Sequence, residues 1–152
     1  MFFLHLLYIY ALAMVPVIEL RGAIPMGVSL GVPLRLTMLA AMLGNLTPVP
    51  FLILFTRPIF RWMREKSPFL QKLVARLEQK AVSKEKLLRR YELLGLCILV
   101  AIPLPGTGAW TGALVASVFN IRMKQAFPVI ALGVLIAGIL VSVITYGVAA
   151  LM

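Results

Sequence analysis

The sequence predicts an all-α integral membrane protein. Of its 152 residues, 62% are hydrophobic and only 13% are charged, and the mean hydropathy is +1.02. A water-soluble domain carries about 25% charged residues, and a small one buries only about two-thirds of its unfolded surface. This chain therefore cannot cover its apolar side chains by folding in water. The charges are also unevenly placed, and they leave uncharged stretches at 1–18, 22–34, 36–56, 93–121 and 125–152.

Two of these stretches are long enough to cross a membrane as helices. About 20 helical residues span a hydrocarbon core of roughly 30 Å, and both 36–56 and 125–152 reach this length. In the first, Asn45, Pro48 and Pro50 lie near the middle. They predict a kink, because proline removes a backbone hydrogen bond. We expect the Asn45 amide to bond the carbonyl groups that the kink frees.

The other apolar stretches are interrupted and predict two re-entrant helical hairpins. Prolines and glycines between 103 and 108 leave helical pieces at 93–102 and 109–119, each too short to span. The N-terminal region has a similar break within 16–25, followed by a short apolar piece at 26–32. Four prolines are expected to form these breaks: Pro16, Pro25, Pro103 and Pro105.

The segment 57–92 differs completely from the rest of the chain. It holds 11 of the 15 basic residues and four of the five acids, so it is expected to lie outside the bilayer, in the cytoplasm. Lys72, Arg76, Lys80 and Lys84 recur every four residues beside an apolar stripe, which indicates a basic amphipathic helix on the membrane surface. A solvated helix hairpin, with Glu85 and Arg89 as an ordinary i,i+4 pair, explains the pattern equally well.

The chain is predicted to be a single membrane domain, residues 1–152, containing an inverted repeat. The first repeat is 1–56, the charged segment is 57–92 and the second repeat is 93–152. Gly22 recurs as Gly108 after 86 residues, and Arg35 recurs as Arg122 after 87. With the charged segment inside, the two halves run in opposite directions, as in secondary transporters whose binding site lies near the midplane. The alternative is four plain spanning helices.

The composition argues against an enzyme. The chain has no Asp, one His and one Cys, so neither a metal-ligand cluster nor a Ser-His-Asp triad can form within it. We therefore expect no metal and no cofactor. The net charge of +10 indicates anionic lipid and membrane orientation in such a protein, and not nucleic acid.

Glu19 is the only acid outside the charged segment, and an ionised carboxylate at membrane depth is functional by default. Burial favours the neutral form of a carboxyl group and the nearby Arg21 favours the ionised form, so Glu19 is predicted to exchange a proton near the operating pH. The alternative is a purely structural role, in which Glu19 and Arg21 pair permanently, or either of them pairs with Arg122, and the pair only fixes the hairpin. Substrate or anion binding is expected at six residues: Arg21, Gly22, Gly106, Thr107, Gly108 and Arg122.

Three motifs, at 16–25, 44–50 and 102–112, carry a family resemblance: PVIELRGAIP, GNLTPVP and IPLPGTGAWTG. Together they resemble the small multidrug export proteins of bacteria and archaea, over essentially the whole chain. That family is similar at a greater distance to the DedA, or VTT-domain, superfamily, whose paired re-entrant hairpins are implicated in proton-coupled lipid translocation. The resemblance implies that Glu19 is the acid of the first hairpin and Arg122 the arginine after the second. The chain differs from that superfamily in lacking a second membrane acid and any charge in its second hairpin.

The sequence thus predicts a small transporter of the cytoplasmic membrane that works by alternating access and is coupled to protons. Its expected substrate is an amphiphile, either a lipid phosphate or a small drug-like molecule, and its expected partners are membrane lipids and a second copy of the chain in a homodimer. One alternative is a lipid scramblase that needs no pH gradient. The other is a membrane scaffold whose basic segment recruits partners.

Overall fold

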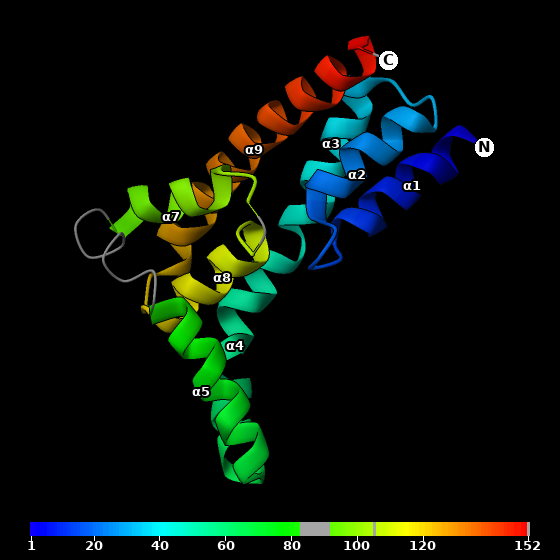
Figure 1. Cartoon of the computed structure of the whole chain (residues 1–152). Coiled ribbons are helices and arrows are strands. Elements are labelled where there is room, and N and C mark those ends of the chain that lie inside the picture. Colours follow the sequence, from blue (N-terminus) through cyan, green and yellow to red (C-terminus); the bar gives the residue numbers. More distant parts are fainter. Residues whose placement is uncertain (83–91, 105, 152) are drawn as a thin grey trace.

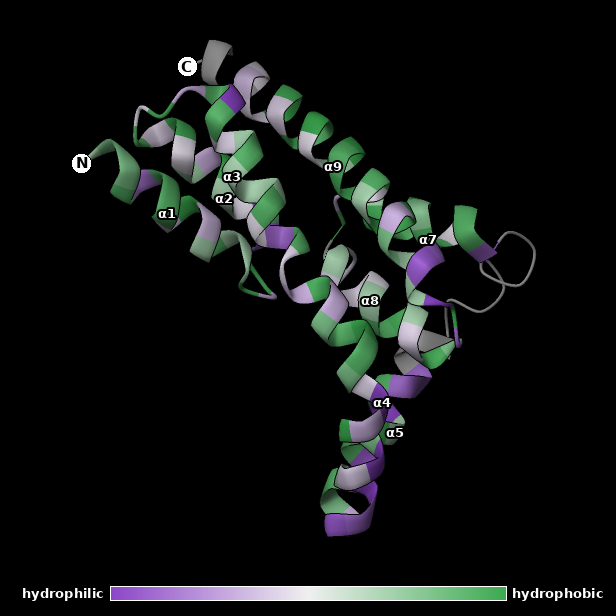
Figure 2. Ribbon diagram, turned by 180° about the vertical axis from the view of Figure 1, so that it is seen from behind, coloured by the Kyte–Doolittle hydropathy of each residue, from purple (hydrophilic) through white to green (hydrophobic). Residues whose placement is uncertain are grey.

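The computed structural model describes residues 1–82, 92–104 and 106–151, and its regular elements within these ranges are all helices. Most of the helices form a body, from which the second half of α4 (Pro48–Lys66) and α5 (Pro68–Val82) protrude as a hairpin (Figure 1). The body is hydrophobic on almost every helix, whereas hydrophilic residues gather on the protruding hairpin (Figure 2). This arrangement agrees with an all-α fold in which the apolar and charged segments of the sequence are separated in space.

The first hairpin consists of α1 (Phe2–Ala13) and α2 (Glu19–Ser29), which lie side by side (Figure 1). The break between them lies earlier than the sequence suggested. Pro16 is in the connection, as predicted, but α2 already begins at Glu19. Pro25 lies inside α2, so its assignment to the break was wrong. One proline removes a single backbone donor, and the helix continues beyond it, with the Leu30 amide donating to the carbonyl of Met26.

The predicted kinked span is α3 (Leu34–Leu46) followed by α4, joined at Thr47, just before the Pro48–Pro50 pair. α4 continues to Lys66, ten residues beyond the predicted end at 56. Two helical segments, Leu34–Lys66 and Met123–Gly147 within α9 (Met123–Leu151), are long and apolar enough to cross a membrane. α3 and α9 lie side by side and run in opposite directions (Figure 1), and Gly138 of α9 faces Met38 and Met42 of α3.

The second hairpin agrees with its prediction to within one residue at each helix end. It consists of α7 (Glu92–Ala101) and α8 (Ala109–Val118), and the break between them contains Pro103. Pro105 lies outside the described residues. α7 packs on α9, as α1 packs on α3.

Helix ends in the two halves repeat at a spacing of 89 residues. After α2, Gly31 has a φ of 74°, and the Val32 amide donates to the Gly27 carbonyl at 3.0 Å. After α8, Asn120 has a φ of 67°, and Ile121 bonds to the carbonyl of Ala116 at 3.0 Å. Both ends are Schellman caps with a buried apolar residue after the left-handed one.

The same spacing relates two glycines at helix crossings. A Cβ on Gly44 of α3 would overlap the carbonyl oxygen of Tyr10 in α1, and one on Gly133 of α9 would lie 2.7 Å from Cβ of Val100 in α7. Each glycine therefore lets a long helix approach the first helix of its own hairpin.

The Gly22–Gly108 and Arg35–Arg122 pairs are not structural equivalents: Gly22 lies inside the first turn of α2, whereas Gly108 is the N-cap of α8.

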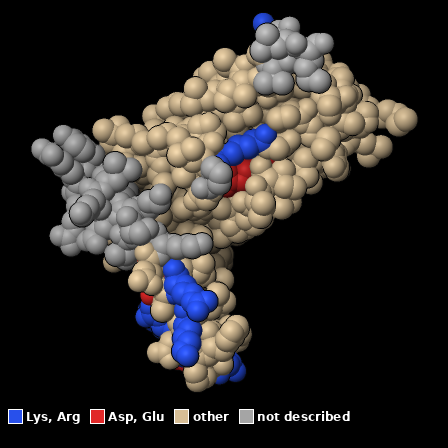
Figure 3. All heavy atoms as spheres, in the orientation of Figure 1, with Lys and Arg blue, Asp and Glu red and all other residues tan. Residues whose placement is uncertain are grey.

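The described part of the charged segment belongs to the protruding hairpin, and both interpretations of this segment stay predictions. α5 packs against α4 and α8, Val74 of α5 is fully buried, and Arg64 forms an ion pair with Glu78. Basic side chains gather on this hairpin, while the face of the body in the same view is almost uncharged (Figure 3). The predicted Glu85–Arg89 pair and Lys84 lie outside the described residues.

Candidate functional site at the junction of the two helix breaks

Glu19 lies where the two helix breaks meet. Its side chain is only 3% exposed, and its backbone has a φ of 50°, in the left-handed region that L-residues rarely adopt. This conformation starts α2 and turns the carboxylate toward α8, where Oε1 accepts a long hydrogen bond, 3.4 Å, from the backbone amide of Trp110. The carboxylate of the first hairpin therefore faces the amino end of a helix in the second, where the helix dipole favours negative charge.

Gly108 makes room for that carboxylate. A Cβ at this position would overlap Oε2 of Glu19 and lie 2.7 Å from its Cδ. The sequence predicted that the amides around Gly108 and the start of α8 bind a substrate anion. In the structure, the anion at this helix end is the carboxylate of Glu19 itself.

Arg21 binds the other side of the second break. Its guanidinium donates to Oγ1 of Thr107 at 2.8 Å, to the carbonyl of Ile102 at 3.3 Å, and also to the carbonyl of Leu104. The Thr107 hydroxyl lies 2.7 Å from both of these carbonyl oxygens. The carbonyls follow the end of α7, where a helix leaves acceptors unpaired and a cation is favourable. Arg21 thus stabilises the turn that follows α7 in the second break.

Trp110 makes the reciprocal contact. Its indole Nε1 donates to the carbonyl of Met14, the C-cap of α1, at 3.1 Å. Trp110 stands 89 residues after Arg21, the same spacing that relates the helix caps. Each of these two side chains therefore bonds a carbonyl beyond the first helix of the opposite hairpin.

Glu19 and Arg21 do not form an ion pair with each other within 4.0 Å, and they take different partners, as their i,i+2 spacing predicted. Arg122 is not part of this junction. It is exposed and lines a separate hollow with Arg57. The amide of Gly22 donates to the carbonyl of Ile18 inside α2, so it is not open to an anion. The structure therefore brings Glu19 to Gly108 and Arg21 to Thr107 of the second break, and leaves Gly22 and Arg122 out. Gly106 lies in the same break, where its carbonyl accepts a hydrogen bond from Thr111.

Asn45 also departs from its predicted role. Its side chain is 1% exposed, yet neither its amide nitrogen nor its oxygen has a hydrogen-bond partner among the described residues. It therefore does not bond the carbonyls freed at the Pro48 and Pro50 kink.

An apolar hollow of about 420 Å³ lies beside the junction. Phe51, Phe55 and Ile59 of α4 line one side of it, and Met14 and Trp110 extend it to the junction. The sequence did not single out the α4 residues, because apolar side chains at helical spacing are equally typical of a lipid-facing surface. Their only signal was their position just after the predicted kink.

In the described parts of the chain, no group of three or more His, Cys, Asp or Glu side chains is placed to hold a metal ion. The polar groups of the junction are one carboxylate, one guanidinium, hydroxyls and backbone amides. Carboxylate and guanidinium groups can bind protons and anions.

An all-helical fold with two segments long and apolar enough to cross a membrane is typical of a small helical membrane protein. Residues 19–140 match the family model described as "Putative small multi-drug export protein", so the chain belongs to that family. This is a class of export proteins of the membrane and not a class of enzymes. No curated protein and no solved structure matches the chain. The more distant resemblance to DedA proteins stays a prediction.

Proposed function

We propose that this protein carries an amphiphilic substrate across the cytoplasmic membrane by alternating access, and that protonation of Glu19 controls the step. The observation that carries the proposal is the position of Glu19, a buried carboxylate of one hairpin that accepts the amide of Trp110 in the other. A change of charge at this residue acts on both hairpins at once.

Proton uptake provides the coupling. The ionised carboxylate is attracted by the amino end of α8, and neutralising it removes that attraction. The junction then depends on Arg21 and Trp110, whose hydrogen bonds involve no acidic partner. Protonation is therefore expected to favour separation of the two breaks, which is the movement that alternating access needs.

The apolar hollow supports an amphiphile as substrate. Its volume of about 420 Å³ is in the range of sites for drug-sized molecules. Trp110 belongs both to this hollow and to the junction, so a molecule bound there touches a residue that connects the two hairpins. Either a small drug-like molecule or the apolar part of a lipid phosphate fits this chemistry.

Two further elements belong to the proposal. The 89-residue spacing of the helix caps and the opposite directions of α3 and α9 support an inverted repeat of two re-entrant hairpins, with the charged segment 57–92 in the cytoplasm. We also propose a homodimer, because α9 exposes many apolar side chains for a second copy or for lipid to cover. Crosslinking in native membranes that gives only monomers would contradict the dimer.

The test is transport in proteoliposomes that contain the full chain. The probes are ethidium and a fluorescently labelled phospholipid, each followed with and without an imposed pH gradient. We expect the gradient to accelerate movement of at least one probe in the wild type. This acceleration should disappear in Glu19→Gln, which keeps the shape of the side chain and removes its charge, and transport should fall in Arg21→Ala. Glu92→Gln is the matched control, because it neutralises an exposed acid of α7.

Other outcomes separate the alternative functions. Lipid movement that ignores the gradient and survives Glu19→Gln indicates a scramblase. A scaffold is indicated if deletion of the charged segment 57–92 abolishes the activity of the protein while Glu19→Gln and Arg21→Ala keep it. Wild-type flux in Glu19→Gln and Arg21→Ala refutes the roles proposed for these residues.

A further inference from the structure

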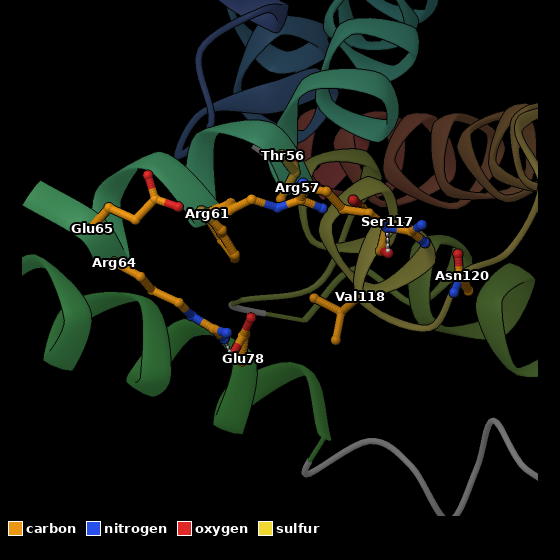
Figure 4. A pocket seen from close by; sticks show the side chains of 10 residues that line it. Thr56, Arg57, Arg61, Arg64, Glu65, Glu78, Ser117, Val118 and Asn120 are labelled. Atoms are coloured by element: carbon orange, nitrogen blue, oxygen red, sulfur yellow. Dashed lines mark hydrogen bonds and ion pairs between the residues drawn. The ribbon is translucent and has the colours of Figure 1, made fainter.

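A second polar site lies away from the junction, where the protruding hairpin meets the body. It is a hollow of about 460 Å³ between α4, α5 and the end of α8 (Figure 4). Arg57, Arg61 and Arg64 line it from α4, Glu78 from α5, and Ser117 and Asn120 from the end of α8. The function proposed above does not use any of these residues.

The hollow carries uncompensated positive charge. Arg64 is paired with Glu78. Within the described chain, Arg57 and Arg61 have no carboxylate within 4.0 Å, and one further acid, Glu65, lies on the wall. The Arg57 Nε donates to the carbonyl of Ser117 at 2.7 Å, which fixes the guanidinium beside the hollow and leaves its two terminal nitrogens for another acceptor (Figure 4).

Ser117 supplies an independent signal. Its side chain is 1% exposed, and its hydroxyl has no hydrogen-bond partner among the described residues. Several other hydroxyls in the described helices bond the carbonyl four residues earlier, as Thr56 does to Leu52 and Ser142 does to Gly138. A buried polar group without a partner is rare in folded proteins, and because Ser117 lies on the wall of the hollow, a ligand there would supply the partner.

A smaller hollow of about 300 Å³ adjoins the first around Arg57. Ser117 and Asn120 line both hollows, and Arg122 lines the smaller one. Arg122, which the sequence predicted to bind an anion, therefore lies near Arg57 and away from the Glu19 junction. Arg57 is also the first charged residue after the uncharged stretch 36–56, where an apolar span ends.

We propose that these joined hollows bind a phosphate group, held by Arg57 and Arg61 with the hydroxyl of Ser117, and with Arg122 beside them. Guanidinium groups present forked donors that match phosphate oxygens, and a serine hydroxyl supplies a further donor. The phosphate comes either from a phospholipid headgroup or from free phosphate in solution. The site is independent of the role proposed for Glu19.

The experiment uses the full chain in a non-ionic detergent and follows its thermal unfolding. One arm titrates inorganic phosphate against chloride at constant ionic strength. The other titrates phosphatidylglycerol against diacylglycerol, which has no phosphate, in mixed micelles. A ligand that binds only the folded protein raises the unfolding temperature, and the increase grows with the logarithm of ligand concentration above the Kd. Stabilisation in both arms identifies any accessible phosphate as the ligand, and stabilisation by phosphatidylglycerol alone identifies a lipid headgroup.

Variants decide whether this hollow is the site. We expect Arg61→Gln to weaken phosphate binding about tenfold, because it removes one of the two guanidinium groups that hold the phosphate. The variant should still fold, because Arg61 makes no hydrogen bond in the described chain. Ser117→Ala should weaken binding several-fold without lowering the unfolding temperature of the free protein, because it removes an unpartnered hydroxyl. Lys72→Gln and Arg76→Gln are the matched controls, since each removes one exposed positive charge of α5.

Three results overturn the proposal. One is that neither phosphate nor phosphatidylglycerol stabilises the protein. Another is that the α5 controls weaken binding as much as Arg61→Gln, which indicates general attraction of anions to a basic surface. The third is that Ser117→Ala binds as tightly as the wild type.

Discussion

The carboxylate of Glu19 fills the space that a side chain on Gly108 would need, and the two residues stand 89 positions apart, the spacing that relates the helix caps of the two halves. Both have a positive φ and both lie at the start of the second helix of a hairpin. The two halves therefore meet through equivalent positions that carry different residues. A second acid at position 108 would collide with Glu19, which gives a physical reason why the junction contains one carboxylate.

Gly108→Ala is expected to destabilise the junction by more than a backbone effect alone. The φ of 118° and ψ of −170° lie in a region that is essentially restricted to glycine and costs other residues about 1–3 kcal/mol. The added Cβ would also overlap Glu19. The measurement is thermal unfolding of the full chain in detergent, together with pH-dependent transport.

Gly31→Ala is the control for Gly108→Ala, because Gly31 has a φ of 74° with nothing within 4 Å of an added Cβ. We expect it to lose only roughly 1–2 kcal/mol of stability. A double-mutant cycle isolates the contact: Gly108→Ala should cost less in a Glu19→Ala background than in the wild type. Equal costs in the two backgrounds would show that the carboxylate does not restrict position 108.

Arg21→Lys is expected to lose most of the stability that Arg21→Gln loses, although it keeps the positive charge. Lysine is a compact charge on a flexible stem and cannot reach three acceptors in one plane as arginine does. Hydrogen bonds to charged groups contribute about 1.5–3 kcal/mol, so a loss of about 2 kcal/mol is expected. Arg35→Lys, at an exposed position of α3, is the control. Unfolding of Arg21→Lys at the wild-type temperature would mean that charge alone matters at this position.

The sequence predicted most of the helices, because uncharged runs and proline clusters are local features. α7 and α8 end within one residue of their predicted limits, and the Pro48–Pro50 pair marks the junction of α3 and α4. The end of the first break was misplaced because Pro25 was expected to interrupt the helix. It removes only one backbone donor, and α2 continues past it. The end of α4 was misplaced because Arg57 and Arg61 interrupt the apolar pattern without interrupting the helix.

Only part of the junction could be predicted from the sequence, and its proposed chemistry stays a prediction. Glu19 was identified because it is a single acid in an apolar region, and no tertiary information was needed. The partners of Arg21 were not predicted, since three of its contacts are with the backbone or a hydroxyl more than 80 residues away. The place of Arg122 beside Arg57 depends on how α4 crosses the end of α8, which no local pattern encodes.

Trp110→Phe is expected to lower stability by about 1 kcal/mol, because it removes the indole donor and leaves the Met14 carbonyl without its bond. The phenyl ring still lines the apolar hollow, so substrate binding should change less than the stability of the junction. Trp62→Phe is the control, because Trp62 is 57% exposed and its substitution should change stability by a few tenths of a kcal/mol. Equal unfolding temperatures for the two variants would remove Trp110 from the contact between the hairpins.

Val74→Asp and Leu73→Asp distinguish the two interpretations of the charged segment. In the structure Val74 is fully buried where α5 packs on its neighbours, whereas Leu73 is 40% exposed. A carboxylate at the fully buried position 74 should cost about 3–5 kcal/mol, since a buried charge is strongly unfavourable. Hydrogen exchange should then rise across 60–79 and stay unchanged in α3 and α9.

Leu73→Asp should leave this exchange near the wild-type level and should not change the affinity of the chain for anionic vesicles. If α5 instead lies on the membrane surface, Leu73→Asp inserts a charge into the lipid-facing stripe, and vesicle affinity falls in both variants. That result would replace the packed hairpin by a surface helix.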